Sequence, residues 1–317
     1  MSFSKDAKMQ ILKVPLKSKE CKLAFMSGLL HASGEFDVVN KTMSYITDIL
    51  DLYDFTNTII SELYGTSTEL SIEEDMKIHK TRYFRITLPK EKTFQMLSDF
   101  GMINAEGEFL YNTIDENLFK DEESKKSFIK GVFLGCATSS IRISEKETEK
   151  TSSGYDIEFV SHSHKFLLEL SSILTDFGIF PKIVQRKKHF VLYVKDSAKV
   201  SDLLAIVEAF DSVLTLQNEL ALREIRNKVN RQTNCLNANI SKTVDASLKQ
   251  VEAIQLISDT IGLESLPLEL QEVALLRLAN PEESLSELLK LSNIDLTKSG
   301  LNHRIKKILK IADNLKS

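Results

Sequence analysis

The pattern of hydrophobic positions predicts an internal repeat in the first two thirds of the chain. The segment Phe25-Met-Ser-Gly-Leu-Leu-His-Ala-Ser-Gly34 recurs loosely as Phe128-Ile-Lys-Gly-Val-Phe-Leu-Gly-Cys-Ala137. Each copy is mostly apolar and has a glycine near its middle. This pattern favours a short, buried helix. We call these two segments the motif helices.

The residues after each motif helix repeat the same order of elements. Each half is predicted to contain a strand, a helix, a second strand and a second helix, and Gly65 and Gly178 are placed to end the first helix of each set. The strand at 83–88 has the clearest signal, because apolar and polar residues alternate along it. The predicted elements are Met43–Ile49, Phe55–Leu63, Tyr83–Leu88 and Glu91–Phe100 in the first half, and Tyr155–Val160, Lys165–Phe177, Phe190–Val194 and Ser197–Phe210 in the second.

These patterns predict an α+β fold followed by an all-α part. Two pseudo-symmetric halves, about 18–112 and 124–212, are expected to form one duplicated domain over residues 1–215. Residues 216–248 are expected to be a basic linker region rich in asparagine and arginine, and residues 249–317 a helix-turn-helix domain. Because the duplication supplies the interface between the halves within one chain, we expect a monomer.

The end of the chain carries the signals of two successive helices joined by a turn. Asn280 and Pro281 are expected to cap and begin the first helix, and Thr297 is expected to cap the second. The inner face of the first helix is predicted to be Leu285, Leu288 and Leu289. The second helix has one apolar stripe, made of Leu301, Ile305, Ile308, Leu309 and Ala312.

The side opposite this stripe is polar and basic. Its side chains can donate hydrogen bonds to phosphates and, near the start of the helix, to base edges in a major groove. A basic helix face is often only a solvated surface, but here a short helix, a turn and an early Asn/His/Arg cluster favour DNA binding. The predicted DNA-binding residues are Thr297, Lys298, Ser299, Asn302, His303, Arg304, Lys306, Lys307 and Lys310.

A second basic stretch precedes this domain, and two interpretations of it stay open. Arginine and asparagine side chains suit phosphate and base contacts, but the same residues also suit a linker whose amides cap helices. Arg226, Asn230 and Arg231 are expected on one side of a helix, with a more open stretch from Asn237 to Lys242. The possible secondary DNA contacts are Arg223, Arg226, Asn230, Arg231, Asn239 and Lys242.

Composition and residue spacing exclude several kinds of site but do not predict a function. The net charge of −4 neither favours nor opposes nucleic acid, but basic and acidic residues segregate along the last third of the chain. The three cysteines, Cys21, Cys136 and Cys235, are too far apart to suggest a zinc site or a disulfide framework. The spacing of His162 and His164 suggests no metal site either, and no nucleotide-binding motif predicts a cofactor. Without a membrane span or a secretory signal, we expect a cytoplasmic, nucleoid-associated protein.

The two motif helices resemble the LAGLIDADG motif of homing endonucleases. That resemblance implies that the helices pack at a pseudo-twofold interface, where Gly28 and Gly131 hold the positions of close contact. In the family, an acidic residue at the end of each motif binds the metals that cleave DNA. Ser33 and Cys136 stand at those positions here, and neither supplies the hard anionic oxygen that magnesium prefers. The resemblance therefore implies a scaffold without nuclease activity.

Nearly the whole chain resembles the WhiA family, which joins a degenerate LAGLIDADG-like domain to a helix-turn-helix. The residues that carry the resemblance are Asn230-Arg-Gln-Thr-Asn-Cys-Leu-Asn-Ala-Asn-Ile-Ser-Lys-Thr243, Leu266-Pro267, Arg277-Leu278, Pro281, Ser284-Leu-Ser-Glu-Leu288 and Thr297-Lys-Ser-Gly-Leu-Asn-His-Arg304. The resemblance implies a transcriptional regulator linked to cell division, chromosome segregation or sporulation, with double-stranded DNA as its partner.

Two other classes of function are weighed against this one. A metal-dependent nuclease with a rebuilt site would depend on Glu35 and Asp37, which have no counterpart in the second half. An interaction protein would use residues 1–215 to bind another regulatory or division protein, and its DNA affinity would be incidental.

Overall fold

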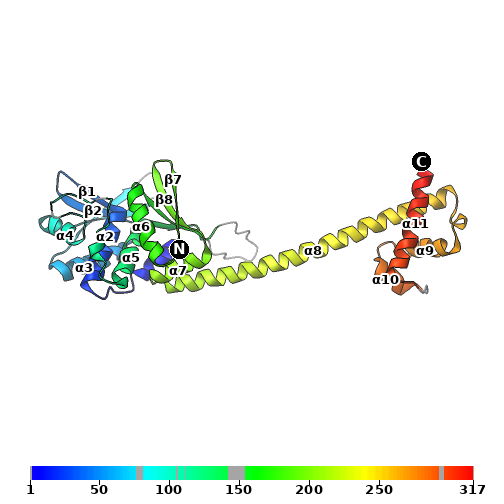
Figure 1. Ribbon diagram of the computed structural model, residues 1–317, viewed down its shortest axis with the longest axis horizontal. Coiled ribbons are helices and arrows are strands. Elements are labelled where there is room, and N and C mark those ends of the chain that lie inside the picture. The colour runs from blue at the N-terminus through cyan, green and yellow to red at the C-terminus, as the bar shows by residue number, and fades with distance from the viewer. Residues whose placement is uncertain are drawn as a thin grey trace. The chain divides into compact units, whose positions relative to one another are not determined.

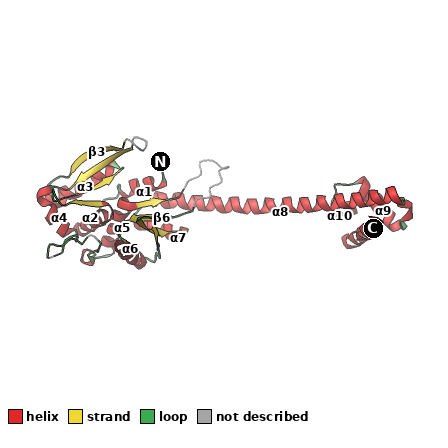
Figure 2. Cartoon of the chain, turned by 90° about the horizontal axis from the view of Figure 1, so that it is seen from above, coloured by secondary structure: helices red, strands yellow, loops and turns green. Residues whose placement is uncertain are grey.

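The computed structural model describes residues 2–75, 81–104, 106–110, 112–141, 154–292 and 296–316 (Figure 1). The chain divides into two compact units, Met1–Ala221 and Leu222–Ser317. In the described residues, strands lie in the first unit, whereas the second unit consists of helices and loops (Figure 2). An α+β part followed by an all-α part was predicted, and this prediction is confirmed.

The first unit contains two halves with the same order of elements. The first half consists of α2 (Lys19–Ser33), β1 (Gly34–Asp37), β2 (Thr42–Thr47), α3 (Leu50–Tyr64), β3 (Glu69–Asp75), β4 (Thr81–Thr87) and α4 (Thr93–Asp99). The second half consists of α5 (Glu122–Cys136), β5 (Ala137–Ser139), β6 (Ile157–Ser161), α6 (His164–Asp176), β7 (Lys182–Arg186), β8 (His189–Val194) and α7 (Ser197–Ile206). A further helix, α1 (Phe3–Ile11), precedes the first half.

Each half has one four-stranded antiparallel sheet. The strand orders are β1-β2-β4-β3 and β5-β6-β8-β7, so the two sheets have the same topology. Gly65 and Gly178 adopt positive φ of 63° and 69° just after α3 and α6, where glycine has no Cβ penalty. The predicted duplication is therefore present, and the predicted helix ends are confirmed.

The motif helices α2 and α5 pack against each other at the centre of the first unit (Figure 1). A Cβ atom on Gly28 would overlap the carbonyl oxygen of Phe128, and one on Gly131 would overlap the carbonyl oxygen of Phe25. Each glycine thus allows the backbone of one helix to touch the backbone of the other. The expectation of close packing through these two glycines is confirmed.

The motif helices start at side-chain caps. Ser18 accepts a hydrogen bond from the backbone N–H of Cys21 at 3.1 Å, and Asp121 forms a capping box with Ser124 at the start of α5. One hydrophobic core runs through both halves and includes Phe25, Phe128 and Leu170. Burial of apolar area from both halves is the main force that joins them.

The second unit contains the C-terminal part of a long helix, α8 (Phe210–Thr260), followed by α9 (Leu268–Ala279), α10 (Leu285–Leu291) and α11 (Lys298–Lys316). Its own core includes Ile257 of α8, Val273 of α9, Leu288 of α10 and Ile305 of α11. No helix in the described part of the chain is both long and apolar enough to cross a bilayer.

Two expectations about this region are wrong. The stretch from Asn237 to Lys242 is not open, because α8 continues through it without a break. Asn280 does not cap α10 but ends α9, and Ser284 caps α10 in a capping box with Glu287. The Ser284 capping box satisfies two backbone N–H groups at once, whereas Asn280 lies a full turn too early to reach them.

Candidate nucleic-acid interface

Helix α11 begins where the sequence predicted. The Thr297 hydroxyl accepts a hydrogen bond from the backbone N–H of Gly300 at 3.2 Å, and helical geometry starts at Lys298. The apolar stripe packs inward: Leu301, Ile305, Ile308 and Ala312 are at most 2% exposed, and Leu309 is partly buried. This burial fixes which face of α11 points to solvent.

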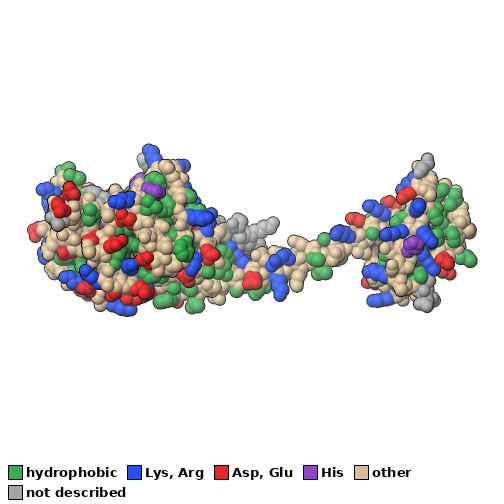
Figure 3. All heavy atoms as spheres, in the orientation of Figure 1, with side chains coloured by type: hydrophobic (Ala, Val, Ile, Leu, Met, Phe, Trp, Pro, Cys, Tyr) green, Lys and Arg blue, Asp and Glu red, His purple; other side chains and the backbone are tan. Residues whose placement is uncertain are grey.

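The outward face of α11 carries almost the whole predicted set. Polar and basic side chains follow one another along it for nearly four turns, and Figure 3 shows basic side chains (blue) around a histidine (purple) on this unit. The exposed members are Thr297, Lys298, Ser299, Asn302, His303, Lys306, Lys307 and Lys310. We call these residues the α11 face.

Arg304 differs from the other members of the predicted set. Its Nη2 atom lies 3.4 Å from Oε2 of Glu269, and its Nη1 donates to the carbonyl oxygen of the same residue at 3.5 Å. The side chain is only 19% exposed. Arg304 therefore ties α11 to the start of α9 in this structure, at the edge of the α11 face.

Arg277 is a buried structural residue of the second unit, and the sequence pattern did not predict its position. It is 1% exposed, and its guanidinium donates to the hydroxyl of Ser247 on α8 and to the carbonyl oxygens of Asn280 and Glu283. Ser247 in turn donates to the carbonyl oxygen of Pro281. These bonds hold the turn before α10 against α8, and so they set where α10 meets α11.

The second basic stretch lies on α8 and is divided between two sides of the helix. At about 100° per residue, Arg223, Arg226 and Asn230 fall on one side, while Arg231 and Lys242 are turned away from them by about 80–160°. Hence Arg231 does not share a face with Arg226 and Asn230, as we had expected. Asn239 lies near Lys242, and its Nδ2 is 3.8 Å from Sγ of Cys235.

The ends of the two motif helices hold no carboxylate. The Ser33 hydroxyl donates to the carbonyl oxygen of Leu29 at 2.9 Å, which ties it to its own helix. Burial raises the pKa of the Cys136 thiol to about 12, so this group stays neutral at physiological pH. Burial also lowers the pKa of the nearby Lys8.

Glu35 and Asp37, the acids beside the first motif, belong to β1. Glu35 forms an ion pair with Arg85 at 3.1 Å. Asp37 accepts hydrogen bonds from Asn40 and Val39 in the turn after β1, and these bonds lower its pKa. Both acids thus have structural partners, as expected of polar residues at the ends of a strand.

His162 and His164 lie beside the second sheet. His162 lies with its ring centroid 4.2 Å from that of His189, and His164 begins α6 after the Ser163 cap. Among the residues that the structure describes, no group of three or more histidine, cysteine, aspartate or glutamate side chains is arranged to hold a metal ion.

The geometry defines a class of protein: two LAGLIDADG-like halves on one chain with a helix-turn-helix unit. Three family models match successive parts of the chain. They are the WhiA N-terminal LAGLIDADG-like domain over residues 19–103, the WhiA LAGLIDADG-like domain over 125–226, and the WhiA C-terminal HTH domain over 229–312.

Full-length relatives agree with these matches. The chain is 35% identical to a probable cell division protein WhiA of Clostridium beijerinckii and 36% identical to one of Clostridium perfringens, in each case over 100% of this chain and 99% of the relative. The crystal structure of full-length DUF199/WhiA from Thermotoga maritima matches with a TM-score of 0.56 and 26% identity, over 99% of each chain. This chain belongs to the WhiA family.

Proposed function

We propose that this protein is a non-catalytic, sequence-specific DNA-binding protein that regulates transcription and is linked to cell division, chromosome segregation or sporulation. The observation that supports it most is the α11 face, a solvent-exposed row of lysine, asparagine, histidine and threonine side chains on a helix whose other side is buried. Relatives that share a third of their residues with it are called probable cell division proteins. Such a protein acts in the cytoplasm, on the nucleoid, and we expect it to be a monomer.

The two ends of the α11 face are suited to different DNA contacts. Thr297, Ser299, Asn302 and His303 lie in the first turns, where a recognition helix contacts base edges in the major groove. Lys306, Lys307 and Lys310 lie further along and are suited to phosphates. Each lysine that neutralises a phosphate releases counterions, so affinity falls steeply with salt. The predicted contacts on α8 would add further phosphate contacts.

Fluorescence anisotropy with labelled promoter duplexes at two salt concentrations tests this proposal. Changing Lys306, Lys307 and Lys310 to glutamate is expected to weaken binding by about a hundredfold or more, because three phosphate contacts become repulsive. The matched control reverses the charge of Lys19, Lys90 and Lys120, three exposed lysines of the first unit. Equal affinity of the α11 variant and the control would overturn the proposal.

The absence of catalysis is part of the same proposal. Ser33 and Cys136 offer a tied hydroxyl and a neutral thiol where a cleaving enzyme would need anionic oxygens. Supercoiled plasmid is therefore expected to stay intact with magnesium. Nicking that Glu35→Ala abolishes would instead establish the nuclease alternative.

The alternative, an interaction protein of the division machinery, places the function in residues 1–215. It predicts specific partner binding by the first unit and normal cell function after loss of α11. Failure of the α11 variant in cells would favour the DNA-binding proposal over it.

A further inference from the structure

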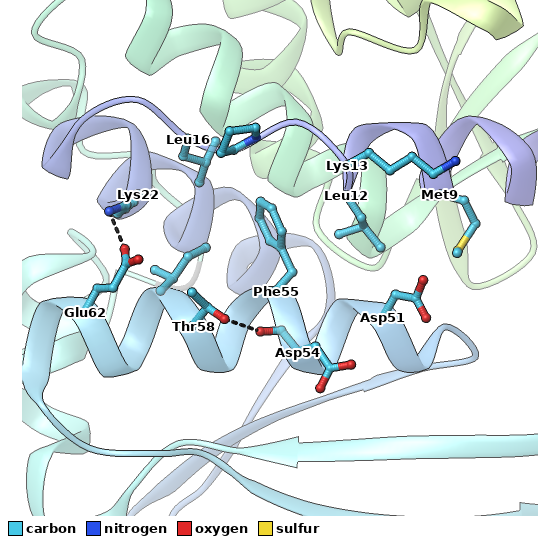
Figure 4. Close-up of a pocket in the computed structure, with 12 residues that line it drawn as sticks. Met9, Leu12, Lys13, Leu16, Lys22, Asp51, Asp54, Phe55, Thr58 and Glu62 are labelled. Carbon is cyan, nitrogen blue, oxygen red and sulfur yellow. Dashed lines mark hydrogen bonds and ion pairs between the residues drawn. The ribbon is translucent and has the colours of Figure 1, made fainter.

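A groove in the first unit lies apart from the α11 face and from the motif-helix ends. It has a volume of about 630 Å³ and runs between α3 on one side and α1 with the segment that follows it on the other (Figure 4). This volume is within the range of about 300–1,000 Å³ that is typical of ligand pockets. We call it the α1–α3 groove.

The floor of the groove is apolar. Leu12 and Leu16 lie on the α1 side, and Phe55 and Ile59 lie on α3. The ring of Phe55 points into the groove in Figure 4 and packs edge-on against Phe25 of α2, with 5.2 Å between the ring centroids. A rigid aromatic floor of this kind favours a bulky apolar side chain, because both surfaces lose water on contact.

The α3 wall of the groove is acidic. Asp51 and Asp54 line it one turn apart and Glu62 lies about two turns further on, and α3 contains no lysine or arginine. Glu62 is paired with Lys22 at 2.5 Å, which closes one end of the groove. Within the described residues, neither Asp51 nor Asp54 has an ion-pair partner. These two carboxylates are therefore available to a cation that enters above the apolar floor.

We propose that the α1–α3 groove is a docking site for a short amphipathic peptide segment of a partner protein, with a bulky apolar side chain flanked by lysine or arginine. The apolar side chain enters between Leu16 and Phe55, and the cation reaches Asp51 and Asp54. Lys13 on the α1 side also lines the groove. Nucleic acid does not fit this surface, because its phosphates would face Asp51 and Asp54, the two carboxylates of α3 that have no ion-pair partner in the described residues. This inference goes beyond the proposed DNA-binding function and does not depend on it.

A labelled peptide tests the proposal on the full-length chain. The probe is a fluorescein-labelled amphipathic peptide of leucine and lysine, and the matched peptide has glutamate in place of every lysine. Anisotropy is measured with the unaltered protein, with the double variant Asp51→Asn/Asp54→Asn, and with Thr58→Arg, which adds bulk and positive charge to the same wall. The control is Glu91→Gln/Glu116→Gln, which removes two exposed charges elsewhere in the first unit. Far-ultraviolet circular dichroism and thermal unfolding of each variant confirm that the first unit is folded.

The lysine peptide is expected to bind the unaltered protein and the control equally. Binding to the Asp51→Asn/Asp54→Asn variant is expected to be at least about tenfold weaker, because the carboxylates that pair with the peptide's lysines are lost. Binding to Thr58→Arg is expected to weaken as much, because the arginine fills the groove and repels the peptide. The proposal is overturned if the lysine peptide does not bind, if the glutamate peptide binds as well, or if the control weakens binding as much. A dimer in solution that Thr58→Arg dissociates would also overturn it, because the occupant would then be a second copy of this chain.

Discussion

The Nη1 atom of Arg277 donates a hydrogen bond to the carbonyl oxygen of Glu283 at 2.6 Å, and this bond joins α9 to the residues just before α10. The same guanidinium reaches Ser247 of α8 at 3.2 Å. A buried cation thus connects three helices through neutral oxygen acceptors.

Replacing Arg277 with methionine is expected to destabilise the second unit by about 2–4 kcal/mol, because buried carbonyl oxygens lose their donors. Urea unfolding followed by far-ultraviolet circular dichroism measures the change, which suits a chain without tryptophan. The control, Arg231→Met, removes an exposed arginine of α8 and should change stability by less than about 0.5 kcal/mol. Equal effects would contradict a central role for Arg277.

The contact between the motif helices predicts a strong dependence on glycine. Gly28→Ala should lower the free energy of unfolding by about 2–3 kcal/mol, because the added methyl group forces α2 and α5 apart. Gly154→Ala is the control, since among the described residues a Cβ there would meet only Oδ1 of Asp156, at 3.7 Å. Thermal unfolding compares the two variants. A Gly28→Ala protein as stable as the control would show that the helices do not touch at this position.

The start of α10 can be assigned by two alanine substitutions. Ser284→Ala removes the cap and should cost about 1 kcal/mol. Asn280→Ala should cost less, because its side chain makes one hydrogen bond, from Nδ2 to the carbonyl oxygen of Leu276. Urea unfolding measures both. The reverse order of effects would restore Asn280 as the cap.

The same cap predicts a dependence on pH. Hydrogen bonds from Ser284 lower the pKa of Glu287 below its ordinary value of 4.5. A carboxyl whose pKa is lowered by folding stabilises the native state above its unfolded pKa, and this contribution disappears as the pH falls through the folded value. Unfolding curves between neutral pH and about pH 3 should therefore show a smaller acid-induced loss for Glu287→Gln than for the unaltered protein. Identical pH profiles would show that the carboxylate does not cap α10.

The cysteines should differ in reactivity. Cys235 is exposed on α8, Cys21 is buried, and burial raises the pKa of Cys136 to about 12. Because the thiolate is the reactive form, iodoacetamide at mildly alkaline pH should modify Cys235 first. Mass spectrometry of the peptides identifies the site, and Cys235→Ser should remove the fast phase. Early modification of Cys136 would mean that its environment is open to water.

The hydrophobic pattern predicted the central strands of both sheets and missed the edge strands. The predicted strands correspond to β2, β4, β6 and β8, which are the central strands of the two sheets. The four missed strands, β1, β3, β5 and β7, all lie at sheet edges. An edge strand is short or partly exposed, so its side chains need not alternate between apolar and polar. Its place depends on pairing with a neighbour far along the chain, such as Glu69 of β3 with Thr87 of β4.

In the candidate site too, the sequence predicted the features that are local and missed those that depend on distant residues. Periodicity alone placed the buried stripe and the outward face of α11, because both follow from the geometry of one helix. It could not show that Arg304 turns back to Glu269, since that contact joins positions 35 residues apart. It also missed the continuity of α8, because asparagine and threonine are weak helix formers and their clustering predicted an open stretch where the helix continues.

The sequence by itself therefore determined the duplication and the basic face of α11, and its resemblance to a known family implied the glycine contact between the motif helices. The duplication and the basic face follow from residue type and local spacing. Only the tertiary structure decided the buried position of Arg277, the capping of α10 by Ser284 and the α1–α3 groove. These features arise where helices from distant parts of the chain meet, and their stability depends on burial and on hydrogen-bond partners that no local pattern specifies.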